Sequence, residues 1–312
     1  MLTGLSLPMV ALLALAGMTL DALLGETRRW HPLVGFGNWA NAIERRLNLG
    51  RGRFWRGVLA WGLAVLPFTL LALWLTGIGN TGLVLHALLL YFCVGLRSLR
   101  EHTMPIAQAL LRGDLAQARQ LTSYIVSRDT QAAQEADLSK AAAESLLENG
   151  NDAVFGTLFW FVVAGGPGAL LFRLANTLDA MWGYRSSRFL AFGCFAARFD
   201  DVLNWIPARL TALSYVLLAA TMADKRRAWH CWRTQAPNWS SPNAGPVMAS
   251  GAGALGLALG GAAVYDGEIE QRPPLGLGRA AVAADIDRAW RLVAATAVLW
   301  VAVLGLAGLL RL

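Results

Sequence analysis

Three apolar runs, each long enough to cross a bilayer as a helix, constrain the fold of this chain most strongly. They cover residues 2–24, 54–76 and 291–310, and a helix needs about 20 apolar residues to span the hydrocarbon layer. Only 15% of the 312 residues are charged, whereas about a quarter are charged in soluble domains. We therefore expect an all-α protein, a polytopic bundle of membrane helices forming a single integral membrane domain over residues 1–312.

The distribution of charge predicts the orientation of the bundle. The net charge is +7, and seven arginines lie between residues 24 and 56. Arginine and lysine collect on the cytoplasmic side of membrane proteins, so we expect this loop and the polar segment 97–152 in the cytoplasm of a cell inner membrane protein. Apolar residues recur at three- and four-residue spacing in that segment, which predicts a cytoplasmic insertion of amphipathic helices, one of them capped by Asp114. The positive charge lies in loops rather than on one basic, aromatic face, which argues against nucleic acid as a partner.

Glycine and proline interrupt two other regions. The apolar block 153–172 contains the sequence GGPG at residues 165–168, which can end one helix and begin another. We predict a broken or re-entrant pair of half-helices there, because a straight crossing would place the charged segment 173–201 outside the cell. Residues 222–290 are expected to be a polar, glycine-rich loop region, in which the GxxxG spacing of Gly256–Gly260 would permit close helix packing.

A polar helix face adjoins this apolar block. Glu144, Glu148, Asn151 and Asp152 have the spacing i, i+4, i+7 and i+8, which places them on one face of a helix. Carboxylates in this arrangement can bind a divalent cation, and one of them can act as a general base. The alternative is a solvated helix face at the membrane surface. Because the helix continues into apolar sequence, we expect part of the face to be enclosed.

Further polar residues are candidates for binding anionic groups. Arginine grips phosphate or carboxylate through paired hydrogen bonds, and a charge at membrane depth is costly unless it is paired. Arg209 lies in an apolar stretch and is therefore either functional or paired with Asp200 or Asp201. The other candidates, most of them in three short polar segments, are Arg128, Asp129, Thr130, Asn149, Asn176, Asp179, Tyr184, Arg185, Arg198 and Asp201.

Taken in order, these segments resemble the adenosylcobinamide-phosphate synthase family of cobalamin biosynthesis, CobD/CbiB. The similarity begins at residues 20–44, with the His-Pro pair at His31, and is most specific over residues 141–213. It ends with the sequence SPNAG, which contains Asn243, and with residues 265–278. The chain departs from the family pattern at Asn151, where Ser or Thr is usual, and at Trp239-Ser240, where His-Pro is usual.

The resemblance implies an enzyme that forms an amide. A propionate of adenosylcobyric acid would be joined to aminopropanol or its phosphate, with ATP driving the reaction and Mg²⁺ assisting. In this reading Glu144, Glu148 and Asp152 are catalytic and hold the metal, while His31, Asn243 and the polar candidates above contact substrates.

Other readings stay open. The chain can instead be a non-catalytic corrinoid-binding or transport protein, or a membrane sensor similar to AmpE. The expected surroundings are membrane lipid, with self-association into a homo-oligomer or contact with other cobalamin-pathway enzymes as further possibilities.

Overall fold

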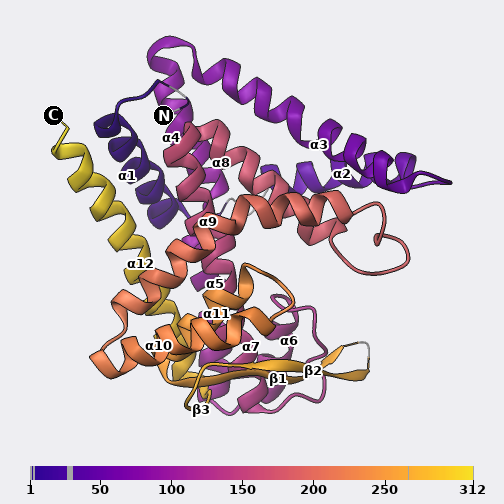
Figure 1. The fold of residues 1–312 in the computed structure, drawn as a ribbon, viewed down its shortest axis with the longest axis vertical. Helices are drawn as coiled ribbons and strands as arrows, with labels where there is room; N and C mark the ends of the chain where they lie inside the picture. Colours follow the sequence, from indigo (N-terminus) through magenta and orange to yellow (C-terminus); the bar gives the residue numbers. More distant parts are fainter. Residues whose placement is uncertain (1, 3, 27–30, 266, 312) are drawn as a thin grey trace. The chain divides into compact units, whose positions relative to one another are not determined.

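The chain is mainly helical and carries one small sheet (Figure 1). The computed structural model describes residues 2, 4–26, 31–265 and 267–311. Two compact units divide the chain: unit 1 comprises Met1–Gly95, Asp152–Asn204 and Val301–Leu312, and unit 2 comprises Leu96–Asn151 and Trp205–Trp300. The single integral membrane domain over residues 1–312 stays a prediction.

The elements follow one another along the chain. In order they are α1 (Leu7–Leu24), α2 (Pro32–Leu47), α3 (Arg53–Thr76), α4 (Gly79–Cys93), α5 (Leu96–Leu111), α6 (Leu115–Ser123), α7 (Glu135–Gly150), the π-helical turn η1 (Asn151–Phe155), α8 (Gly156–Trp182), α9 (Cys194–Leu218), α10 (Met222–Gln235), the 3₁₀ turn η2 (Ala236–Asn238), α11 (Ala244–Leu255), β1 (Leu257–Tyr265), β2 (Glu268–Leu275), β3 (Arg279–Ala280) and α12 (Ala283–Leu309).

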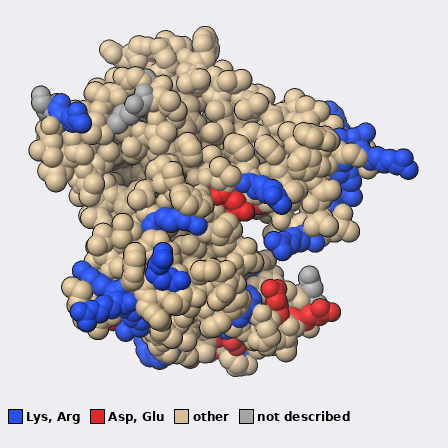
Figure 2. Space-filling model, viewed as in Figure 1, with Lys and Arg blue, Asp and Glu red and all other residues tan. Residues whose placement is uncertain are grey.

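Five helical stretches among the described residues are long and apolar enough to cross a membrane. They are Leu7–Leu24, Arg53–Thr76, Gly79–Leu111, Glu135–Trp182 and Ala283–Leu309. The three apolar runs of the sequence correspond to α1, α3 and α12, so the prediction of a polytopic helical membrane protein is confirmed. Figure 2 shows a broad surface over α3 and α4 with very few charged side chains, and basic side chains gathered near the N-terminal end of α3.

The predicted break in the apolar block is confirmed within α8. The backbone leaves helical geometry at Ala164 and Gly165, where Gly165 has φ 61°. A Cβ placed on Gly156 would come 2.2 Å from Cζ of Phe172. In a straight helix these two residues would be separated by about 24 Å. The chain therefore reverses at Gly165, and α8 is a hairpin of two half-helices.

The close contact between the half-helices yields a stability prediction. Gly156→Ala places a methyl group against the ring of Phe172, which is fully buried, so that the ring has to shift within the packed core. We expect the free energy of unfolding to fall by about 1–3 kcal/mol, the usual cost of overpacking. Gly305→Ala in α12 is the matched control, since no atom lies within 4 Å of its added Cβ. Thermal unfolding of the purified protein in detergent compares the two, and an equal effect of both substitutions would contradict the hairpin contact.

An ion pair fastens the segment after α8 within unit 1. Arg188 donates from Nε and Nη2 to the two oxygens of Glu44, at 3.1 and 2.7 Å. Burial acts to raise the pKa of Glu44, but the hydrogen bonds from Arg188 and Asn48 outweigh it and lower that pKa. The side chain of Arg53 donates to the carbonyl of Arg188 at 2.6 Å. The segment that contains Tyr184 and Arg185 is thus tied to α2 and α3.

Residues 222–290 form ordered helices and a sheet rather than the expected loop region. Small side chains let α10 and α11 pack closely, since a Cβ on Gly253 would lie 2.7 Å from Cα of Ala228. The sheet has the order β2-β1-β3, with β1 antiparallel to β2 and parallel to β3. The expected helix-packing role of Gly256–Gly260 is wrong, because Gly256 ends α11 and Gly260 lies in β1, both at positive φ.

Candidate functional site

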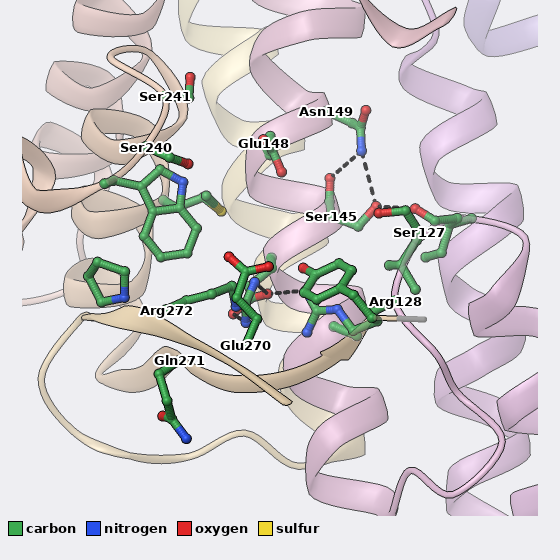
Figure 3. Close-up of a pocket in the computed structure, with 18 of the residues that line it drawn as sticks. Ser127, Arg128, Ser145, Glu148, Asn149, Ser240, Ser241, Glu270, Gln271 and Arg272 are labelled. Atoms are coloured by element: carbon green, nitrogen blue, oxygen red, sulfur yellow. Dashed lines mark hydrogen bonds and ion pairs between the residues drawn. The ribbon is translucent and has the colours of Figure 1, made fainter. Parts of the chain in front are cut away.

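A polar cavity of about 460 Å³ lies within unit 2. Its walls come from the segment after α6, from α7, from the segment before α11 and from the hairpin of β1 and β2. In Figure 3, Glu148 and Asn149 project from α7, with Ser240 and Ser241 across the cavity from them. The lining includes Ser127, Arg128, Glu144, Ser145, Glu148, Asn149, Trp239, Ser240, Ser241, Tyr265, Glu270 and Arg272.

Glu144 connects three of these walls. One of its oxygens, Oε2, accepts hydrogen bonds from Arg128 and, at 3.1 Å, from Nη1 of Arg272. Its other oxygen, Oε1, accepts from Nη2 of Arg272 at 3.2 Å and from the backbone N–H of Gly260 at 2.7 Å. The exposed fractions of the side chains of Arg128, Arg272 and Glu144 are only 12%, 9% and 3%. These three residues, which we call the Arg–Glu–Arg cluster, form a buried charge group beside the cavity.

A β-bulge brings the backbone to Glu144. The register between β1 and β2 shifts between Gly260 and Gly261, and Gly261 faces Arg272. Gly260 has φ 72°, and a Cβ there would lie 2.2 Å from the carbonyl oxygen of Pro273. Only glycine suits this position, because other residues avoid positive φ and would clash with the neighbouring strand. The two adjacent glycines therefore serve the site by directing an N–H group into it.

Arg272 is held from several sides. Its Nε donates to the carbonyl of Gly261 at 3.2 Å, and its guanidinium lies 5.5 Å from the centre of the Trp239 ring. Burial acts to lower the pKa of Arg272, but the charge and hydrogen bonds of Glu144 outweigh it and raise that pKa. The guanidinium is charged and fixed in position.

A second polar cluster lies in unit 1. Asp200 is 7% exposed and accepts hydrogen bonds from Asn204 at 3.0 Å and from Asn176 at 3.4 Å. Burial raises the pKa of Asp200 well above its usual range, and the negative charges of Asp152 and Asp179 raise it further. Three acids from η1, α8 and α9 are thus grouped in unit 1. The reversal of α8 accounts for this grouping, because Asp152 lies in η1 just before the first half-helix and Asp179 lies near the end of the second, so both are at the open end of the hairpin.

Comparison with known proteins identifies the family. The chain matches the model described as CobD/Cbib protein over residues 14–293. It belongs to the CobD/Cbib family. "Cobalamin biosynthesis protein CobD" of Stutzerimonas stutzeri is 57% identical to it, over 95% of this chain and 97% of that protein. The proteins of the same name from Chromobacterium violaceum and Geobacter metallireducens are 53% and 41% identical, over 91% and 84% of this chain and 92% and 85% of theirs. No solved structure matches the chain.

The structure of this CobD/Cbib protein divides the predicted site residues between the two units. Four of them, Arg128, Glu144, Glu148 and Asn149, line the cavity of unit 2. Asn176 lies against the acid cluster of unit 1, where Asp152 and Asp179 act on Asp200 and the charge of Asp201 acts on Asp179. Asp200, rather than the predicted Asp201, is the buried acid of that cluster.

Several other predicted residues make contacts within the protein fold. Nδ1 of His31 accepts the backbone N–H of Leu33 and so caps α2. Thr130 donates to the carbonyl of Arg119 at 3.0 Å, and Asp129 accepts the N–H of Gln131 at 2.8 Å.

Arg209 has its hydrogen-bond partners within unit 2. It donates to Asn243 at 2.8 Å and to the carbonyl of Pro242 at 2.9 Å, and it lies over the ring of Trp205. Arg209 and Asn243, two of the predicted site residues, are therefore hydrogen-bonded to each other. Tyr184, Arg185 and Arg198 are exposed residues of unit 1.

Sequence reasoning missed Arg272, Tyr265, Trp239 and Glu270 as cavity residues. The segments that contain these residues carried part of the family resemblance. The local sequence marked them only by charge, since Glu270 and Arg272 are charged residues between apolar stretches. Among the residues that the structure describes, no group of three or more His, Cys, Asp or Glu side chains is placed to hold a metal ion.

Proposed function

We propose that this protein joins a propionate carboxylate of adenosylcobyric acid to aminopropanol or its phosphate in an ATP-dependent step, at the cytoplasmic side of the inner membrane. As a member of the CobD/Cbib family it has a role in cobalamin biosynthesis, in agreement with the names of its relatives. The observation that carries the finer proposal is the cavity of unit 2, which is lined by the guanidinium groups of Arg128 and Arg272 and by the carboxylates of Glu148 and Glu270.

Formation of the amide needs both a guanidinium group and a carboxylate. A carboxylate is a poor acyl donor, so ATP first transfers its terminal phosphoryl group to the propionate, giving an acyl phosphate and ADP. The amine then attacks the carbonyl carbon, and phosphate leaves. Arg128 offsets the negative charge of the phosphoryl and carboxylate groups, which grows in the transition state. Glu148 takes the proton that the ammonium must lose before it can attack.

Magnesium fits some of the proposed ligands better than others. Both oxygens of Glu144 are engaged by guanidinium groups and a backbone N–H, so Glu144 does not suit a metal. Glu148 lines the cavity, and Mg²⁺ in phosphate-transfer sites is often bound by one or two carboxylates together with substrate phosphates. A carboxylate bound to the metal is a weaker base, so this role of Glu148 is an alternative to its role in proton transfer. Magnesium held in this way would neutralise phosphate charge.

The proposal is tested with the purified protein in detergent. Adenosylcobyric acid, ATP and Mg²⁺ are supplied with either aminopropanol or aminopropanol phosphate, and products are followed by mass spectrometry. We expect a product with the combined mass of acid and amine less one water, formed together with ADP. Corrinoid binding without any ATP-dependent product would instead support a non-catalytic binding or transport protein.

A further inference from the structure

The Arg–Glu–Arg cluster is more costly than a structural link requires. Removing charged groups from water is expensive, and apolar side chains of similar volume often serve stability equally well. Here two arginines from separate segments, Arg128 after α6 and Arg272 on β2, meet one carboxylate beside a cavity. The cluster keeps a net positive charge, since one carboxylate faces two guanidinium groups.

We propose that Arg128 and Arg272 together form the binding site for a phosphate group, with Glu144 as their shared counter-ion. The inference rests on the proposed function, in which ATP and aminopropanol phosphate are the possible sources of that phosphate. It assigns Arg272 to substrate binding and gives Glu144 a role other than metal binding or catalysis.

Both guanidinium groups retain donors for a ligand. An arginine has five N–H donors in a planar fork that matches the oxygens of phosphate. Arg272 uses Nε for Gly261, one donor on each terminal nitrogen for Glu144, and a further hydrogen bond for the side chain of Tyr265, which leaves one of its five N–H groups. Arg128 donates from Nη2 to Glu144. The contacts among the described residues thus leave at least one N–H group on each arginine, and the Trp239 ring and the β-bulge fix the plane in which that of Arg272 lies.

The remaining charges of the cavity agree with a phosphate that carries a cation beside it. Glu148 and Glu270 also line the cavity and add negative charge. An isolated phosphate would be repelled by them. Magnesium-bound ATP and aminopropanol phosphate each bring a positive group next to the phosphate, so both suit a cavity with paired arginines and nearby carboxylates.

Lysine substitutions test the site. Arg128→Lys and Arg272→Lys each keep the positive charge toward Glu144 but remove the planar fork. Binding of three probes to the full chain in detergent is measured by calorimetry: magnesium-ATP, aminopropanol phosphate and inorganic phosphate. We expect Kd for the phosphate compound that the site accepts to rise at least about tenfold in both variants, since hydrogen bonds to charged groups are lost. The probe that is weakened identifies the source of the phosphate.

Arg227→Lys is the matched control. Arg227 pairs with Asp224 on α10 and does not line the cavity, so Kd for every probe should stay at the wild-type value. The proposal is overturned if both cluster variants bind all three probes as tightly as the Arg227 variant does, or if the wild-type chain binds none of them. A wild-type chain that binds phosphate at this site yet forms no amide would refute the proposed function and leave the phosphate site standing.

Discussion

Glu148→Gln is expected to lower the rate of amide formation by at least about a hundredfold, the lower end of what a positioned general base contributes. Glutamine keeps the shape of the side chain but cannot accept the proton of the ammonium. Glu148 lines the cavity beside the Arg–Glu–Arg cluster, where the carboxylate and the amine are proposed to react. The substitution therefore acts on proton transfer between the reacting groups. The measurement is the initial rate of product formation at saturating ATP, corrinoid and amine. The rate should recover in part as the pH is raised, because more of the amine is then already neutral.

The control for this substitution is Glu268→Gln. Glu268 is an exposed acid at the beginning of β2 and does not line the cavity. Its replacement should leave both the rate and the thermal midpoint of unfolding unchanged. If Glu148→Gln also retains the wild-type rate, Glu148 is not the base. The acid cluster around Asp200 is then the next candidate for proton transfer.

Glu144→Gln should reduce stability rather than only activity. The substitution leaves the guanidinium groups of Arg128 and Arg272 buried without their common counter-ion. Breaking a buried ion pair in this way costs about 3–5 kcal/mol. We expect a correspondingly large fall in the thermal midpoint of the purified protein, and easier proteolysis of the β1–β2 hairpin that Glu144 holds through Gly260 and Arg272.

An exposed pair provides the comparison. Glu101→Gln removes one partner of Arg97, and the side chains of Glu101 and Arg97 are 46% and 36% exposed. Exposed ion pairs contribute at most about 1 kcal/mol, so the midpoint should hardly move. Replacing Glu144, Arg128 and Arg272 together with Leu or Met should restore most of the stability lost in Glu144→Gln, because no buried charge is then left unpaired. Equal midpoints for Glu144→Gln and Glu101→Gln would show that the cluster is not a buried ion pair in solution.

Local sequence patterns predicted the helical part of the fold well. An uninterrupted apolar run in a membrane is expected to form a helix, because only a helix supplies hydrogen-bond partners for all its backbone groups within one segment. The break at Gly165 was also predictable, because GGPG interrupts a helix whatever surrounds it. The sheet was not: β1 reads LALGGAAVY without polar alternation, and β2 contains two prolines, which are unusual in a strand.

In the candidate site as well, contacts within one helix were predictable and contacts between distant segments were not. Helical spacing brought Glu144 and Glu148 together correctly, since a helix fixes which of its own residues share a face. The same spacing added Asp152, which belongs to unit 1, where its charge acts on Asp200. Arg272 could not be predicted as a partner of Glu144. Their meeting depends on a hairpin 128 residues further along the chain and on a bulge that shifts its register.

That separation has a consequence for biosynthesis. During translation Glu144 emerges from the ribosome well before Arg272, and until then Arg128, 16 residues upstream, is the only one of its two arginines available. Until the β1–β2 hairpin has been synthesised, the charge of Glu144 is therefore paired with one arginine instead of two. Completion of the pocket is therefore a late event in the synthesis of this chain, and a nascent polypeptide halted before β2 contains the helices α1 to α11 but no finished site.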